Sequence, residues 1–294
     1  MSFFLRHAPG RTLYDTVAED SAAVVIREYS SSFGLASRLL AEPVRTQVRN
    51  VYALVRVADE VVDNPDPTLE RETRATMLTW LEQDVRHALD AGYSGNLVVH
   101  AFARTASAVG IGEDVVAPFF ASMRMDLDTT AHTPETFDRY VYGSAEVVGL
   151  MCLRTFLAAP DGPADRETAY ERLAPGARHL GAAFQKLNFL RDLAEDHDVL
   201  RRDYFPGLDV DGFCDADRDR ILDDIDGDLH AAAEVVEDLP SSSRRAVRAA
   251  HATFAELASR LRATPAGEIR RRRVRVPAAV KLRLAAGAIH GGRS

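Results

Sequence analysis

The chain has 294 residues, 46% of them hydrophobic, which is enough to bury a large core in one or two domains. Its formal net charge of −8 argues against a general nucleic-acid binder, and its two cysteines, Cys152 and Cys214, fit no metal or redox spacing. The N-terminus lacks the apolar stretch of a signal peptide, and the longest apolar runs stop well short of the ~20 residues that a membrane span needs. We therefore expect a cytoplasmic protein with free thiols.

Hydrophobic periodicity is helical in almost every segment. The first helix is expected over residues 16–30 with Asp15 as its N-cap, and the second over 42–63 with Pro43 in its first turn. The sequence NPDP ends the second helix, and the third covers 68–92, closed by Gly92. Further helices are expected over 96–110, 113–128, 134–159, 175–200, 215–239, 240–263 and 277–289.

Strand alternation and fixed-period repeats are not seen in the sequence, and the connections between helices are short. This pattern predicts one all-α domain over residues 1–294. Residues 51–62 and 147–158 are apolar around most of the helix circumference, which indicates helices in the middle of the structure.

Two expected helices each carry a pair of aspartates four residues apart, Asp59 with Asp63 and Asp192 with Asp196. Asn188 continues the second stripe by one turn. For any such pair a solvated helix face is the alternative, but here apolar residues surround both pairs. If the two helices face each other, four carboxylates converge and need a divalent cation. Oxygen ligands without His or Cys favour Mg²⁺, with Mn²⁺ as the alternative metal.

Arginines lie near both acidic pairs: Arg49 and Arg56 before the first, Arg191 and Arg202 around the second. Arginine suits a bidentate grip on phosphate oxygens. Carboxylates, arginines and an apolar bundle together indicate a diphosphate head held by metal, with a hydrocarbon tail in the core. The chain has no G-x-S-x-G elbow, Walker loop, H-E-x-x-H or G-x-G-x-x-G sequence.

Five stretches resemble, in content and order, the squalene/phytoene synthase family: YSSSFGLASRLL, VRNVYALVRVADEVVD, MRMDLD, YVYGSAEVVGLM and NFLRDLAEDHDVLRRDYFP. The C-terminal stretch RRRVRVPAAVKLR is similar to bacterial phytoene synthases. The resemblance implies an isoprenoid synthase-type helical bundle with a central active-site cavity. It also implies head-to-head condensation of two allylic prenyl diphosphates through a cyclopropylcarbinyl diphosphate.

The resemblance assigns roles to individual positions. It implies that Asp59, Asp63, Asn188, Asp192 and Asp196 bind Mg²⁺, and that Tyr140 acts with the four aspartates in catalysis. Glu146 and Tyr29 depart from the family pattern, because many members have a small residue at the first position and some have histidine at the second. The expected substrate-binding positions are Ser30, Ser32, Phe33, Arg56, Ala145, Val148, Gly149, Gln185, Asn188, Arg191, Arg202 and Tyr204.

The favoured reaction is the synthesis of phytoene from geranylgeranyl diphosphate without NADPH. The runner-up is squalene or dehydrosqualene synthesis from farnesyl diphosphate. A class I terpene cyclase or head-to-tail synthase usually has D-D-x-x-D where this chain has D-E-x-x-D, and a non-catalytic scaffold of the same fold is the last alternative.

The expected partners are prenyl diphosphates and no nucleic acid. The arginine run before an apolar helix near Pro277 also suggests peripheral contact with anionic lipid on the inner face of the membrane. A basic solvated tail is the alternative for this segment.

Overall fold

The computed structural model describes residues 11–30, 32–64, 66 and 68–290, leaving aside the side chains of residues 32, 33 and 290. The regular elements of the described chain are helices, and Ala131 and Asp203 form an isolated β-bridge. The expected all-α class is therefore confirmed. The elements are α1 (Leu13–Tyr29), α2 (Ser32–Ser37), α3 (Val44–Val62), α4 (Arg71–Ala91), α5 (Leu97–Val109), α6 (Glu113–Asp128), α7 (Pro134–Val141), the π-helical turn η1 (Tyr142–Glu146), α8 (Val147–Leu157), α9 (Arg166–Asp198), α10 (Asp215–Val236), α11 (Ser241–Arg262), α12 (Ala266–Ile269) and α13 (Ala278–His290).

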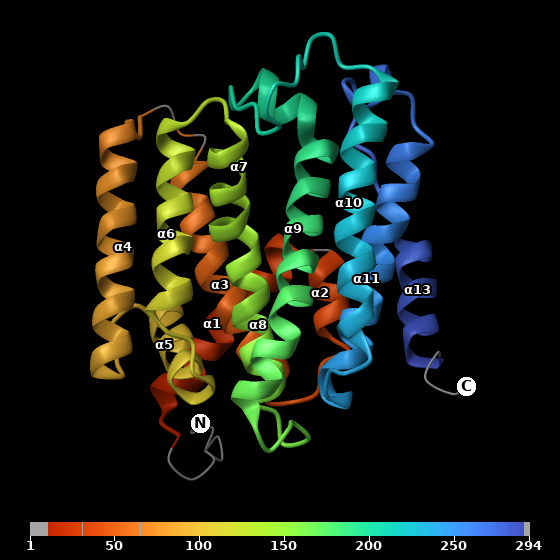
Figure 1. Ribbon diagram of the computed structural model, residues 1–294. Helices are drawn as coiled ribbons and strands as arrows, with labels where there is room; N and C mark the ends of the chain where they lie inside the picture. Colours follow the sequence, from red (N-terminus) through yellow and green to blue (C-terminus); the bar gives the residue numbers. More distant parts are fainter. Residues whose placement is uncertain (1–10, 31, 65, 67, 291–294) are drawn as a thin grey trace, which may run out of the picture.

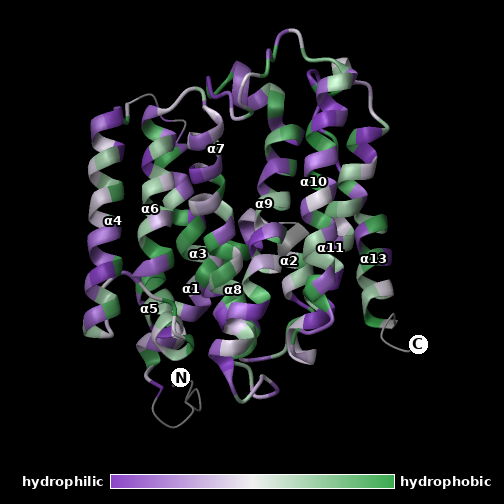
Figure 2. Cartoon of the chain, viewed as in Figure 1, coloured by the Kyte–Doolittle hydropathy of each residue, from purple (hydrophilic) through white to green (hydrophobic). Residues whose placement is uncertain are grey.

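The long helices stand side by side in a bundle, with α4 at one edge and α13 at the other (Figure 1). The longest helix, α9, packs against α8, η1 and α10, while α3 packs against α1, α4, α5 and α8. Both α3 and α8 are mostly hydrophobic in the middle of the bundle (Figure 2). Among the described helices, none combines the length and the apolar character that a bilayer span requires.

Two apolar cores lie on either side of the bundle centre. One surrounds α3, α5 and α6 and contains the fully buried Phe102, Phe119 and Phe120. The other surrounds α9 and α10 and contains the fully buried Leu190 and Leu222. A cavity is lined in part by α3 and α8, and its buried apolar lining includes Leu153, Leu173 and Val48 from smaller clusters. This explains the apolar circumference of 51–62 and 147–158, because each helix packs on a core and also faces the cavity.

Several helix boundaries differ from the sequence prediction. The N-cap of α1 is Thr12 and not Asp15, since Thr12 Oγ1 accepts from the Asp15 amide at 3.1 Å while Asp15 Oδ2 accepts from the Thr12 amide at 2.8 Å. Pro43 is the N-cap residue of α3 and not part of its first turn. Gly92 ends α4 in the left-handed region, with φ of 72°, as predicted.

The helix predicted over 175–200 begins earlier, at Arg166, with Asp165 accepting from the Thr168 amide at 3.1 Å. Pro175 therefore lies inside α9 and not at its start. The proline is exposed, so the carbonyl that loses its helical partner there can bind water instead.

The helix predicted over 134–159 is interrupted by the π-helical turn η1, which separates α7 from α8. A Cβ atom at Gly143 would lie 2.0 Å from Ser122 Oγ and 2.3 Å from the Pro118 carbonyl oxygen, so α6 crosses η1 at very short range. The short helices α2 and α12 were not predicted. The expectation of one domain over 1–294 stays a prediction.

Candidate active site

The central cavity has a volume of about 290 Å³ and is lined almost entirely by apolar side chains from α3, α8, α9, α10 and α11. The predicted positions Ala145, Val148, Gly149, Gln185 and Asn188 all line it. Gln185 and Asn188 are its polar end, and the lining continues down α9 through small residues. The arrangement suits a long hydrocarbon with a polar head.

Glycines allow α8 and α9 to approach closely along this cavity. A Cβ atom at Gly149 would lie 2.4 Å from the carbonyl oxygen of Ala177. A Cβ atom at Gly181 would likewise lie 2.5 Å from the carbonyl oxygen of Ala145. Gly149 therefore sets the helix spacing as well as forming part of the wall.

Arg202 joins the two acidic motifs. Its Nη1 donates to Asp63 Oδ1 at 2.6 Å, and its backbone amide donates to the Asp196 carbonyl oxygen at 2.9 Å. Asp63 is the C-cap of α3, and Asp196 lies in the last turn of α9, so the carboxyl-terminal ends of both helices meet. Asp63 and Asp196 are thus linked through Arg202, while convergence of all four carboxylates on a metal stays a prediction.

Each acidic pair has one member neutralised by arginine and one that is not. Asp63 accepts from Arg202, while Asp192 pairs with Arg191 and Arg273, each at 2.6 Å. Within the described chain, Asp59 and Asp196 form no ion pair. Burial, followed by the charge of Asp63, raises the pKa of Asp59 to about 8. Burial, followed by the charge of Asp192, raises the pKa of Asp196 to about 8.

This donor set fits Mg²⁺. All the donors are hard oxygens, and burial together with neighbouring carboxylates disfavours the ionised forms of Asp59 and Asp196, which a bound cation would favour. In the described part of the chain, no three acidic, His or Cys side chains already form a compact ligand group. Carboxylates spread over two helix ends suit ions that also take substrate phosphate oxygens as ligands. The residues that would hold the metal are Asp59, Asp63, Asn188, Asp192 and Asp196.

A further carboxylate beside the acidic motifs, Asp126 on α6, was not predicted to belong to the site, and its side chain is only 6% exposed. It accepts hydrogen bonds from Tyr140 Oη at 2.9 Å and from Tyr204 Oη at 3.2 Å, and its backbone oxygen accepts from Arg202 Nη2 at 2.9 Å. Burial raises its pKa to about 7 although the nearby Arg202 charge opposes this. Asp126 has no acidic partner one turn away, so the spacing that revealed the other four could not reveal it.

Tyr140, predicted to act in catalysis with the four aspartates, is not among the residues that line the cavity. Its side chain is buried behind the cavity, with ring centroids 5.9 Å from Phe189 and 5.3 Å from Tyr204. Phe189 and Tyr204 stack with centroids 3.9 Å apart. Burial raises the pKa of Tyr140 well above its ordinary value, so its hydroxyl stays protonated and donates to Asp126. Tyr140 and Tyr204 therefore support the site from behind.

Four other positions were predicted to bind substrate: Arg56, Ser30, Ser32 and Phe33. Arg56 donates to Glu60 at 2.5 Å and lies over the Tyr29 ring, 4.6 Å from its centroid. Ser30 Oγ accepts from the Gly34 amide at 3.2 Å. The side chains of Ser32 and Phe33 lie outside the described residues.

Two departures from expectation concern residues near the cavity. The carboxylate of Glu146 pairs with Arg178 Nε at 2.6 Å and does not line the cavity. Tyr52 does line it, on the same helix as Arg56 and Asp59, and was missed. Tyr52 lies one turn before Arg56 on the same helix face, and this spacing could have identified it as a residue of the site.

A sequence profile of the squalene/phytoene synthase family matches residues 26–279. The chain belongs to this family. Its acidic motifs, Arg202 and the cavity all lie within the matched range.

Curated relatives in the family carry different names. Phytoene synthase 3, chloroplastic, from Zea mays is 31% identical over 198 residues, which cover 66% of this chain and 44% of the maize protein. Presqualene diphosphate synthase from Rhodopseudomonas palustris is 29% identical over 174 residues, which cover 58% of this chain and 57% of that protein. The chain thus matches less than half the length of its plant relative.

Solved structures share the fold. A dehydrosqualene synthase superposes with a TM-score of 0.74 at 20% identity, covering 94% of this chain and 97% of that one. A squalene synthase from Alicyclobacillus acidocaldarius gives 0.71 at 16% identity, covering 86% and 96%. The isoprenoid synthase-type bundle expected for the squalene/phytoene synthase family is confirmed.

Proposed function

We propose that this protein is an Mg²⁺-dependent prenyltransferase that joins two molecules of geranylgeranyl diphosphate head to head into phytoene, through a cyclopropylcarbinyl diphosphate. The observation that carries the proposal is the contact of Arg202 with both acidic motifs at the polar end of an apolar cavity. The curated name of the maize relative favours phytoene as the product.

The chain's own residues supply binding, orientation and exclusion of water. Arg56, Arg191 and Arg202 lie near the acidic motifs and can hold diphosphate oxygens. Bound Mg²⁺ would neutralise charge on the leaving diphosphate. The apolar walls below Asn188 shield an allylic cation from water, since water would otherwise quench it. Within the described lining of the cavity there is no histidine, so the released diphosphate is the base that we assign to the final proton.

The position of the lining residues supports a long substrate. Asn188 and Leu173 both line the cavity and are separated along α9 by 15 residues (188 − 173), a rise of about 22 Å at about 1.5 Å per residue. This wall offers a long apolar surface to a prenyl chain whose head lies near Asn188.

Dehydrosqualene or squalene synthesis from farnesyl diphosphate is the second candidate. It is favoured by the relative named presqualene diphosphate synthase, because the match covers 57% of that protein's length, against 44% for the maize phytoene synthase. Its smaller substrate also fits inside the same cavity.

Product identification separates the candidates. The purified protein is incubated with Mg²⁺ and either C15 or C20 diphosphate, with and without NADPH, and the extract is analysed by ultraviolet absorption and mass. We expect a C40 product with a conjugated triene, formed without NADPH and abolished by chelation. A C30 product with the triene would keep the chemistry and overturn the substrate. A product without the triene that needs NADPH would overturn the phytoene assignment.

We also propose peripheral contact with lipid through the basic C-terminal segment. Several arginines of this segment form ion pairs within the protein, so fewer positive charges are available to lipid than the sequence suggests. Arg270 pairs with Asp198 at 3.1 Å, Arg272 pairs with Glu268, and Arg273 pairs with Asp192. These arginines therefore neutralise acids of the same chain.

A further inference from the structure

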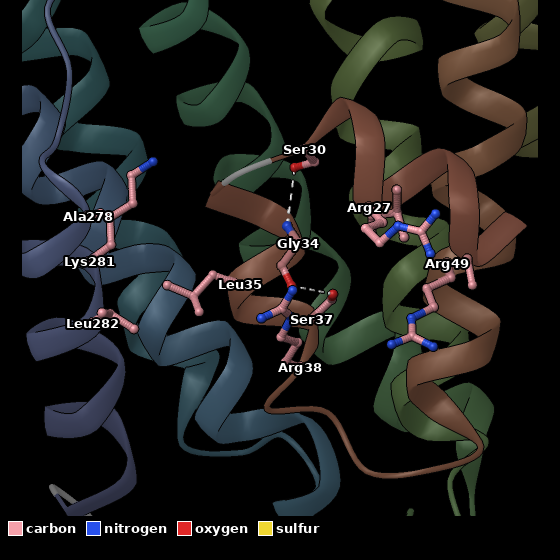
Figure 3. A pocket seen from close by; sticks show the side chains of 12 residues that line it. Arg27, Ser30, Gly34, Leu35, Ser37, Arg38, Arg49, Ala278, Lys281 and Leu282 are labelled. Atoms are coloured by element: carbon pink, nitrogen blue, oxygen red, sulfur yellow. Dashed lines mark hydrogen bonds between the residues drawn. The ribbon is translucent and has the colours of Figure 1, made fainter.

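Three hydroxyl side chains line the central cavity, and one of them has no hydrogen-bond partner among the residues that the structure describes. Ser37 Oγ donates to the carbonyl oxygen of Gly34 at 2.9 Å, as Figure 3 shows. The hydroxyl of Tyr52 shares a hydrogen bond with Ser30. Ser144 Oγ, on the π-helical turn η1, is buried and is left without such a partner.

The packing of α6 on η1 explains why this hydroxyl is unpaired. A serine inside a helix often donates to the backbone carbonyl oxygen four residues earlier, which for Ser144 is that of Tyr140. Ser144 does not make this bond, and the Tyr140 carbonyl oxygen accepts from Ser122 Oγ at 3.2 Å instead. Ser122 comes this close because α6 crosses η1 at very short range beside Gly143. The hydroxyl of Ser144 is therefore left at the cavity wall.

An unpaired hydroxyl in an apolar wall destabilises the folded protein, so the content of the cavity has to account for it. The neighbouring wall positions Ala145 and Val148 are apolar. A hydrocarbon chain in this cavity offers the Ser144 oxygen no hydrogen-bonding atom. A positive charge carried by that hydrocarbon would be attracted by the lone pairs of the oxygen, because no water screens the interaction there.

The place of Ser144 along the cavity matches the part of a prenyl chain where charge develops. The adjacent Ala145 packs against Gly181 of α9, whose Cβ atom would lie 2.5 Å from the Ala145 carbonyl oxygen. Gly181 precedes Asn188 by 7 residues (188 − 181), a rise of about 10 Å. A metal and a diphosphate held near Asn188 fill the first part of this distance. The hydroxyl of Ser144 then lies beside the first carbons of the prenyl chain.

We propose that Ser144 is a catalytic residue whose Oγ lone pairs face the allylic cation that forms when diphosphate leaves. This role rests on the proposed function, because the cation belongs to that reaction. An oxygen dipole fixed in an apolar wall stabilises charge that appears only as the C–O bond breaks. It therefore lowers the barrier of the reaction without strengthening the binding of the uncharged prenyl chain.

The first test is kinetic and compares Ser144→Ala with Ser243→Ala. The control removes a buried hydroxyl that donates to the Pro240 carbonyl oxygen at 3.1 Å and lies outside the cavity lining. We expect Ser144→Ala to lower kcat about tenfold with KM unchanged, the loss of one contact made only in the transition state. Ser144→Thr, which keeps the oxygen, should restore most of kcat, and Ser243→Ala should behave like the parent. Parental kcat in Ser144→Ala, or no recovery in Ser144→Thr, would overturn the role.

The second test needs no turnover. Binding of a C20 prenyl dimethylammonium ion, which carries its charge beside the first carbons, is compared with binding of the hydrocarbon that has carbon in place of nitrogen. Both are measured by displacement of a fluorescent apolar probe, with Mg²⁺ and inorganic diphosphate present. We expect Ser144→Ala to bind the ammonium ion about tenfold more weakly and the hydrocarbon like the parent.

This pair of ligands separates failure of the role from failure of the proposed function. Equal affinities of parent and Ser144→Ala for the ammonium ion, or an equal loss for both ligands, would show that Ser144 does not recognise positive charge. A selective loss for the ammonium ion in a protein that converts neither C15 nor C20 diphosphate would overturn the proposed reaction and keep Ser144 as a group that binds a cation.

Discussion

Arg202 and Asp63 are 139 residues apart in the sequence and are joined by a hydrogen bond of 2.6 Å from Nη1 to Oδ1. The same arginine is buried, contacts Asp126 and follows the second acidic motif directly. Burial of a charged guanidinium is tolerated because carboxylates surround it. Arg202 therefore fixes how far apart the two acidic motifs stand before any metal or substrate is bound.

Replacing one aspartate of each motif with asparagine should have the same effect on activity and opposite effects on stability. Asp59→Asn and Asp192→Asn should each lower turnover by at least ~10², as expected for a key electrostatic group. In the metal-free protein at about pH 8, Asp59→Asn should raise the free energy of unfolding by at least ~1 kcal/mol, because it removes an unpaired buried charge. Asp192→Asn should lower it by about 1 kcal/mol, because ion pairs with arginine are lost. Urea denaturation measures the free energy of unfolding, and product assays measure turnover. Near-parental turnover of either variant would refute the metal assignment of that aspartate.

The stability of the metal-free protein should fall as pH rises. The folded-state pKa values of Asp59 and Asp196 are about 8 and that of Asp126 is about 7, all above the unfolded value of about 4. The folded state therefore holds more protons between these limits, and the free energy of unfolding decreases from about pH 5 to about pH 8. Added Mg²⁺ should flatten this slope, because it replaces the protons. A rising stability over this interval in the presence of a chelator would contradict the assignment.

Asp126→Asn should lower turnover about tenfold while the protein stays folded, because the negative charge beside Arg202 is lost and one of the two tyrosine hydroxyls loses its acceptor oxygen. The matched control is Asp128→Asn, two residues away on the same helix, whose exposed side chain pairs with Arg71. Steady-state kinetics and circular dichroism compare the two. An equal effect of both variants would show that Asp126 has no special place in the site.

Cys152 on α8 lines the cavity two turns beyond Ala145. A larger side chain at this position would make the cavity shallower. Cys152→Phe should shift the preference from C20 towards C15 diphosphate by at least about tenfold, because a pocket that loses volume rejects the longer chain. Cys214→Phe is the control, since Cys214 is exposed and far from the lining. Competition between the two substrates, read by product mass, gives the ratio. An unchanged ratio would mean that the chain does not reach Cys152.

Gly149→Ala should cost about 1–3 kcal/mol of stability, because its Cβ atom would lie 2.4 Å from the Ala177 carbonyl oxygen and push α8 away from α9. Gly227→Ala on α10, where a Cβ atom meets nothing within 4 Å, should instead gain about 0.5–1 kcal/mol from helix propensity. Thermal denaturation compares the pair. A stabilised Gly149→Ala protein would show that the close helix contact is not required.

The sequence predicted best what repeats at a fixed spacing. Asp59 with Asp63 and Asp192 with Asp196 could be found because both members of each pair fall on one helix face. Asp126 lies in the family-like stretch MRMDLD, but it was not assigned a role because no acidic residue stands one turn from it and its partners come from α7 and the loop after α9.

The location of individual side chains in the folded structure was the hardest feature to predict from the sequence. Arg49 lies on the same helix as Arg56 but two turns from it, where the neighbours are α1 and α2 and not the aspartates. Tyr140 matched a family position by sequence, but a ring packed against Phe189 and Tyr204 cannot also face the cavity. Such outcomes depend on tertiary packing, which no local pattern contains.

The pairing of Arg273 with Asp192 bears on how the molecule is made. During synthesis the first acidic motif leaves the ribosome more than two hundred residues before this arginine, so all four aspartates are translated while one of their neutralising partners is still missing. A nascent chain can form the helices around Phe119 and Leu190, but Asp192 then has Arg191 and not yet Arg273 as its partner. Completion of the acidic centre therefore waits for Arg273, which is translated after all the helices that carry the aspartates.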